Sequence, residues 1–272
     1  MKPALQTHLP FSAWSDPQLS RLPGILPLEP GGWIMMDEAF RGQMALRDRL
    51  IADNRKQTVA LDPAALPAAQ ELLRAILVLL EQDEEYSIGE TCVTRPDDVT
   101  VRLDLDDPLG TAGRLVQEDL CLLQPGQGGE HVLTGGAVCF PAYWSLTEKF
   151  LHPMTRIHVP VPVYDPEVAR RVQRLFDAVR PERPLWRANA HLSEHPDIAT
   201  PAKEGDHPTR AGIDAPYLRS EKQCVLRLPK TDAVVFSIHT YMVRRTDLTP
   251  DQQASLSDVM EKRIAARQLS SD

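Results

Sequence analysis

The chain has 272 residues, of which 42% are hydrophobic and 25% charged, and it carries a formal net charge of −8. Its length admits one large domain or two small ones, and its apolar fraction is enough for a sizeable core. The acidic balance argues against nucleic acid, and against an anionic membrane surface, as the main partner.

The four cysteines are far apart and form no C-x-x-C pair, which argues against a disulfide framework, an iron–sulfur cluster and a structural zinc site. No signal-peptide core opens the chain, and no apolar run approaches the roughly 18 residues of a membrane helix. We therefore expect a cytoplasmic protein with free thiols and no membrane partner.

The first part of the chain predicts an arm followed by helices. Residues 1–32 are rich in proline and glycine, which indicates a surface arm with little regular structure. Residues 38–52 have the mixed charge of a helix, and Asp62-Pro63 supplies the cap and first-turn proline for a second helix over 67–81. Apolar residues recur along that second helix at the spacing of a buried face: Leu72, Leu73, Ile76, Leu77 and Leu80.

Strands are expected after residue 85. Residues 99–105 alternate between polar and apolar, so one face should be buried and the other solvated. Residues 118–124 predict a second strand, and the turn at 125–129 joins it to a third over 132–140. A bulge is expected in that third strand at Gly135-Gly136.

A lone histidine follows. Ser145 and Glu148 have capping-box spacing, which predicts a short helix. Residues 157–162 should then leave that helix, because a residue that precedes proline is pushed towards extended geometry. This would hold His158 in a stiff, apolar segment, which suits an axial ligand to a metal cofactor. The alternative is an ordinary core histidine.

The remainder of the chain adds a helix from Asp165-Pro166, a strand over 185–192, and a polar loop over 193–216 that is a candidate lid. Strands over 223–228 and 234–242 should form a hairpin, and Thr249 with Gln252 should cap a last helix. The sum is an α+β fold with a mostly antiparallel sheet flanked by helices. We expect the arm at 1–32 and a single domain over 33–272.

Seven short stretches occur together in one order: WIMMD from Trp33, VQEDLCLLQ from Val116, CFPAYW from Cys139 with Glu148-Lys149, IHVPVP from Ile157, WRAN from Trp186, RSEKQ from Arg219 with Arg227-Leu228-Pro229, and FSIHTY from Phe236. This ordered set, over roughly residues 33–245, resembles the α subunits of the haem-dependent oxidative N-demethylases.

The resemblance implies a PAS-like haem-binding domain, with haem b held by His158. It implies an oxygenase component that uses O2 to demethylate a small secondary amine of the dimethylamine type. Because the chain has no G-x-G-x-x-G and no iron–sulfur cysteine set, electrons would come from a separate reductase or ferredoxin-type partner. FMN, a 2Fe-2S cluster and NADPH would belong to those partner subunits.

Two departures from the family pattern bear on the substrate. The family usually has Asn-Trp where this chain has Asn189-Ala190, and Glu-Arg-Gln-Thr where it has Glu221-Lys222-Gln223-Cys224. Both changes are expected near the pocket, where Lys222 could neutralise Glu221. They put the identity of the amine substrate in question, but they need not disturb haem binding.

The expected catalytic residues are Glu221, Arg219 and Tyr241. A carboxylate at Glu221 can hold a secondary ammonium or a proton, and Arg219 shares its strand face; the alternative is a surface ion pair. The Tyr241 hydroxyl can donate to oxygen or a propionate; the alternative is a packed ring.

The expected cofactor-binding residues besides His158 are Arg187, Asn189 and Arg227. Arg187 and Asn189 alternate on one strand face, where they can bind haem propionates or order the lid; exposed strand residues are the alternative. Other iron ligands are less favoured: His239, and the thiols of Cys121, Cys139 and Cys224, which should be small buried hydrophobes. Asp37 is favoured as a helix cap over a site residue.

Two other functions remain open from the sequence. One is a haem-PAS sensor of gas or redox state, and the other is a non-catalytic paralogue that binds a partner, with or without haem. The chain has no kinase-like or DNA-binding output segment, which counts against a sensor that signals by itself.

Overall fold

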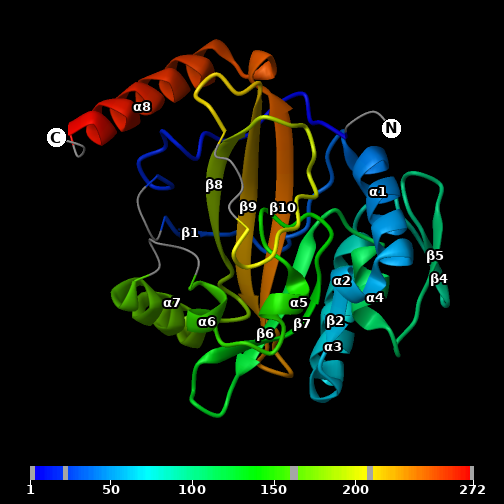
Figure 1. Ribbon diagram of the computed structural model, residues 1–272. Coiled ribbons are helices and arrows are strands. Elements are labelled where there is room, and N and C mark those ends of the chain that lie inside the picture. The colour runs from blue at the N-terminus through cyan, green and yellow to red at the C-terminus, as the bar shows by residue number, and fades with distance from the viewer. Residues whose placement is uncertain (1–3, 21–23, 160–164, 207–210, 270–272) are drawn as a thin grey trace.

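A computed structural model describes residues 4–20, 24–159, 165–206 and 211–269. Antiparallel strands and helices give the expected α+β fold. Figure 1 shows the main sheet with helices on both of its faces. The strands of this sheet lie in the order β1 (Leu26–Pro27), β8 (Leu185–Ser193), β9 (Tyr217–Arg227), β10 (Val234–Arg244), β6 (Asp119–Pro125), β7 (His131–Ala137) and β2 (Val59–Leu61). A second sheet contains β3 (Ser87–Ile88), β4 (Cys92–Thr94) and β5 (Thr100–Arg102).

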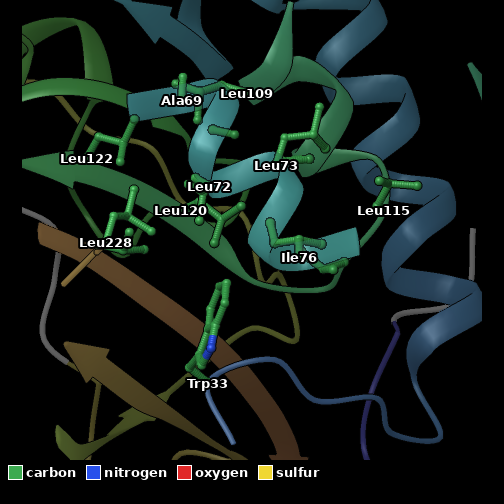
Figure 2. Close-up of a cluster of buried hydrophobic side chains, with 14 of the residues drawn as sticks. Trp33, Ala69, Leu72, Leu73, Ile76, Leu109, Leu115, Leu120, Leu122 and Leu228 are labelled. Carbon is green, nitrogen blue, oxygen red and sulfur yellow. The ribbon is translucent and has the colours of Figure 1, made fainter. Parts of the chain in front are cut away.

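The larger hydrophobic core lies on one face of the main sheet, against α3 (Leu66–Leu80). Leu72, Leu73 and Ile76 of this helix are fully buried and pack towards Leu120 and Leu122 of β6 (Figure 2). This confirms the apolar face predicted from the sequence. The helix follows η1 (Pro63–Ala65), and Asp62 caps that turn by accepting a hydrogen bond from the backbone N–H of Ala64.

The stretch Pro63–Leu80 is long and apolar enough to cross a membrane by length and composition, contrary to the expectation that no apolar run approaches that length. In the structure its apolar face packs against the sheet in the hydrophobic core. Beside α3 lie α1 (Phe40–Asp53), α2 (Arg55–Thr58) and α4 (Pro108–Gly113). A Cβ on Gly135 would lie 2.9 Å from Leu109 Cδ1, so glycine in β7 is what permits the close approach of α4.

The opposite face of the sheet is covered by α5 (Leu146–Lys149), α6 (Met154–Ile157) and α7 (Pro166–Ala178), which Figure 1 shows beside the lower halves of β8, β9 and β6. The side chain of Asp165 caps α7 through the N–H groups of Glu167 and Val168, as predicted. His158 is the C-cap of α6 rather than an extended residue. Residues 160–162 of its proline-rich segment lie outside the described residues.

The chain ends with η2 (Arg245–Asp247) and α8 (Pro250–Leu269). Thr249 and Gln252 form the predicted capping box by exchanging hydrogen bonds of 3.1 and 3.2 Å. The box expected at Ser145 does not form, because Glu148 instead accepts a hydrogen bond from the backbone N–H of Glu204. A side chain that finds a tertiary partner can leave a helix start without its local cap.

Several strands differ in length from their prediction, and β5 covers only Thr100–Arg102 of the expected 99–105. β7 ends at Ala137 instead of residue 140, because the Asp119 carboxylate accepts the N–H groups of Cys139 and Phe140. The irregularity expected near Gly135 occurs as a register shift opposite Leu122 and Leu123. β9 begins at Tyr217, six residues earlier than predicted, and pairs with β10 along its full length.

Candidate functional site

A cavity of about 560 Å³ lies between the main sheet and the helices on its second face. The strands contribute apolar side chains such as Cys121, Val225 and Phe236, and α7 contributes Val172 and Leu175. Residues 202–206, within the loop predicted as a lid, complete its lining. The size and the apolar lining are those of a small-molecule or cofactor site.

Four polar side chains from β8 and β9 lie side by side on the face of the sheet that forms the cavity floor: Arg187, Asn189, Glu221 and Gln223, called the polar quartet below. Arg187, Glu221 and Gln223 line the cavity, and Asn189 lies beside them without lining it. Arg187 pairs with Gln223 and Asn189 with Glu221 in the strand register. Side chains two apart on a strand share a face, and directly paired residues are neighbours across strands. This geometry brings together the predicted Arg187, Asn189 and Glu221 and adds Gln223.

Glu221 has partners on both carboxylate oxygens. Oε1 accepts hydrogen bonds of 3.2 and 3.1 Å from the Arg219 guanidinium. Oε2 accepts from the side-chain amides of Asn189 at 3.0 Å and Gln223 at 2.9 Å. Burial opposes ionisation, but the charge of Arg219 and these hydrogen bonds outweigh it and lower the pKa of Glu221. Glu221 is therefore an anion at neutral pH whose charge Arg219 balances.

Arg187 presents an uncompensated charge to the same cavity. Its Nε is buried without a hydrogen-bond partner among the described residues. Burial lowers the pKa of Arg187, against which the charge of Glu221 acts, but an arginine still stays protonated in proteins. The Oδ1 atom of Asn189 is also buried and without a partner in the described part of the chain.

His158 lines the helical side of the cavity, across from the sheet floor. Its Nδ1 lies 2.9 Å from the carbonyl oxygen of Met154. A carbonyl only accepts, so Nδ1 carries the proton and the lone pair belongs to Nε2. Burial lowers the pKa of His158, and the charge of Lys149 lowers it further. A neutral imidazole with a fixed tautomer is the form that ligates iron.

The loop over the cavity is attached to α5 and α6 by ion pairs. The Glu204 carboxylate contacts Lys149 Nζ at 2.7 Å and the Arg156 guanidinium at 2.8 Å. These partners lower the pKa of Glu204 to about 2. Earlier in the loop, the carbonyl of Thr200 accepts a hydrogen bond from the N–H of Tyr143. The expected lid segment therefore lies against the cavity with Glu204 as its charged anchor.

Tyr241 and Arg227, which were expected at the site, lie elsewhere. Tyr241 packs on the opposite face of the sheet, because it pairs with Ser220 whereas Glu221 pairs with Thr240. The Arg227 guanidinium donates to the carbonyls of Val179, Phe176 and Asp232, outside the cavity lining. Neither residue is among those that line the cavity.

Arg219 is buried behind Glu221 and donates to the carbonyls of Phe140 and Ile198. It is not among the residues that line the cavity. In this position Arg219 holds the Glu221 carboxylate and balances its charge.

The two departures from the family pattern lie on the far face of the sheet. Lys222 extends away from Glu221 and donates to the carbonyl of Gly32, and its Nζ lies 5.5 Å from the Trp186 ring centroid. Ala190 packs with a cluster that includes Phe11 and Leu192. Because neighbouring residues of a strand point to opposite faces, Lys222 does not neutralise Glu221 and neither change reaches the cavity.

The less favoured iron ligands fit the geometry less well. Both ring nitrogens of His239 contact carboxylates, Glu118 at 2.8 Å and Asp37 at 3.0 Å, on the far face of the sheet. Asp37 accepts the N–H of Ala39 in the turn before α1, but it is not the helix cap, because the N-cap of α1 is Ala39 and no side chain caps this helix. Cys121 lines the cavity, but burial raises the pKa of its thiol, which disfavours the thiolate.

Within the described residues, no group of three or more His, Cys, Asp or Glu side chains is arranged to hold a bare metal ion. A haem requires only an axial side chain and an apolar slot, and His158 with the cavity walls provides both. Sequence reasoning missed Arg171, Lys149 and Lys203, which also line the cavity. Their signal was weak, because isolated basic residues on a helix or loop usually face solvent.

A protein-family model matches residues 24–265 of the chain, and its description is "Haem-dependent oxidative N-demethylase, alpha subunit-like". The matched range contains His158, the polar quartet and the loop over the cavity. It also contains the seven stretches noted in the sequence.

Proposed function

The chain belongs to the haem-dependent oxidative N-demethylase, alpha subunit-like family, and from this premise we propose that it is the haem-binding oxygenase component of such an enzyme. The proposed reaction removes a methyl group from a small N-methylated amine as formaldehyde, with O2 as the oxidant. The observation that carries the proposal is the cavity, with His158 on its helical side and the polar quartet on its sheet floor.

His158 would hold the iron of a haem b. Its Nδ1–H is hydrogen-bonded to the Met154 carbonyl, which fixes the tautomer in which Nε2 is the nitrogen suited to ligate a metal. The apolar walls suit the macrocycle, and Arg171 and Lys203, which are exposed cations in the lining, are suited to its propionates. When bound, the haem supplies O2 activation and oxidation of the N-methyl carbon.

The polar quartet would position the amine on the sheet floor. An ammonium is costly to bury unless it is paired, and the anionic Glu221 offsets part of that cost from within the cavity. Arg219 keeps Glu221 ionised, while Asn189 and Gln223 hold the carboxylate in a fixed orientation. The loop anchored by Glu204 would exclude water from the same space.

Electrons would reach the site from other subunits. The family description is that of an alpha subunit, and the chain contains no G-x-G-x-x-G and no iron–sulfur cysteine spacing. We propose a partner reductase that carries FMN and a 2Fe-2S cluster and oxidises NADPH.

A hemin titration of the purified protein tests the proposal. We expect one haem per chain with a Soret band, and formaldehyde release when an N-methylated amine, O2 and a reductant are added. His158→Ala should lose stable haem binding, whereas His152→Ala, a change at an exposed histidine outside the cavity lining, should retain it. A wild-type protein without a Soret band would overturn haem binding. Haem binding without formaldehyde from any amine tested would favour the sensor.

A further inference from the structure

The sheet floor of the cavity contains a positive charge that no described residue pairs. Arg219 and Glu221 balance each other through two hydrogen bonds, and the other oxygen of Glu221 is held by Asn189 and Gln223. A carboxylate has about four lone-pair sites, so Glu221 has none left for Arg187. The quartet together with Arg219 therefore has a net charge of +1, located at Arg187.

A hydrogen-bond acceptor without a partner among the described residues, Asn189 Oδ1, lies next to Arg187. Asn189 Nδ2 donates to Glu221, which fixes the orientation of the amide and makes the partnerless buried atom its Oδ1. Arg187 and Asn189 are two apart on β8 and share a face, with an approximate spacing of 7 Å along the strand. Buried polar atoms without partners are rare in native proteins, because each loses its hydrogen bonds to water without replacement. A ligand that brings a carboxylate to Arg187 and an ammonium to Glu221 would complement the two charged groups that line this part of the cavity.

We infer that the substrate is an N-methylated amino acid, with its carboxylate on Arg187 and its ammonium beside Glu221, both of which line the cavity. This inference rests on the proposed function and specifies its substrate class. The guanidinium fork of arginine matches a carboxylate bidentately. A simple dialkylamine offers only a cation, which the charge of Arg187 repels.

A carboxylate can reach Arg187 from either of two sources, the substrate or a haem propionate. The substrate is favoured because the exposed Arg171 and Lys203 also line the cavity and suit propionates, which are costly to bury. Arg187, in contrast, belongs to the quartet on the sheet floor, with its Nε fully buried.

The test compares N-methylglycine with dimethylamine, which carry the same secondary amine with and without a carboxylate. Binding to the haem-loaded protein is measured by calorimetry and by the shift of the Soret band. The expected result is that N-methylglycine binds at least tenfold more tightly than dimethylamine, on the order of 1.4 kcal/mol. Arg187→Gln should abolish the preference and Arg187→Lys should retain part of it. Arg174→Gln, which removes an exposed cation of α7 outside the cavity lining, should leave the preference intact.

Three results would overturn the inference. Equal or tighter binding of dimethylamine to the wild type would do so while leaving the proposed function standing. If Arg187→Gln lowers haem affinity and leaves the preference for N-methylglycine unchanged, the carboxylate that Arg187 binds is a haem propionate and not the substrate. If the protein takes up no haem, the proposed function fails. Calorimetry with the haem-free protein then tests the inference on its own. If the haem-free wild type shows no Arg187-dependent preference for N-methylglycine, the inference is overturned as well.

Discussion

At the residue scale, the charge of Glu221 is balanced inside the protein before any ligand binds. Arg219, its ionic partner, is buried and also donates to the carbonyls of Phe140 and Ile198. Glu221 thus has two roles, one in the cavity and one in holding a buried cation. A substitution there changes both.

Replacing Glu221 with glutamine should weaken the amine-induced Soret shift and destabilise the protein. The loss of charge leaves the buried Arg219 unpaired, and breaking a buried pair costs about 3–5 kcal/mol. Urea unfolding and amine titration measure the two effects. Lys222→Gln, on the far face of the sheet, should leave the amine titration unchanged. A Glu221→Gln protein with wild-type stability and amine affinity would contradict this account.

The buried histidine on the far face should make stability pH-dependent. Burial favours neutral His239, but hydrogen bonds and charges from Asp37 and Glu118 outweigh it and raise its pKa to about 9. Because the folded pKa lies above the ordinary value of 6.5, the stabilisation is fully present below pH 6.5 and is lost as the pH rises through 9.

Unfolding free energy should therefore fall between pH 6.5 and 9, by an amount on the order of 3 kcal/mol. His239→Gln should remove this slope, because glutamine does not titrate. His152→Gln, at an exposed site, serves as the control and should keep it. Urea unfolding across this pH range measures the slope, and an equal slope in the His239→Gln protein would assign it to another group.

At the element scale, the loop over residues 200–206 is positioned by a few polar contacts rather than by a strand or helix. Backbone hydrogen bonds tie Thr200 to Pro141 and Tyr143, and Glu204 provides the ionic anchor to α5 and α6. Arg156 and Glu204 are partly exposed whereas Lys149 is buried, so salt should screen the Glu204–Arg156 pair more than the Glu204–Lys149 pair.

Glu204→Gln should accelerate the escape of haem, because the loop loses both cationic partners at once. Transfer of haem to an excess of a haem-free acceptor protein measures the rate, and added salt should accelerate it in the wild type more than in the variant. Glu182→Gln is the control, at an exposed glutamate outside the cavity lining. Equal transfer rates in wild type and Glu204→Gln would show that the anchor does not retain haem.

At the scale of the whole molecule, the sheet separates a large hydrophobic core from the cavity. Leu72 of α3 is fully buried in that core, whereas His158 lines the cavity on the other face. Stability supplied by the core and stability supplied by a ligand should therefore be separable by mutation.

Haem should raise the unfolding free energy of the wild type by about 2.7 kcal/mol at a free concentration of 100 times Kd. Leu72→Ala should lower the haem-free stability by about 2–5 kcal/mol and keep the haem-dependent gain. His158→Ala should do the reverse, with near-normal haem-free stability and little gain. Unfolding curves with and without haem test this, and a gain lost in Leu72→Ala would mean that the two sides are coupled.

The sequence by itself determined the elements whose signals are local. The apolar spacing of α3, the start of α7 at Asp165-Pro166 and the capping box of α8 were all predicted, because helix periodicity and helix starts depend on residues within a turn or two. The ordered stretches were enough to indicate the family, and the alternation along β8 was enough to group Arg187 with Asn189.

Tertiary structure alone decided which side of the sheet each strand residue faces relative to the cavity. Tyr241 and Glu221 belong to adjacent strands, and only their register places them on opposite faces. The roles of Arg219 and Arg227 were likewise set by carbonyls far away in the sequence, such as Phe140 and Val179. Alternation specifies which residues share a face, but the choice of the cavity face depends on which helices pack there, and that is a long-range property of the fold.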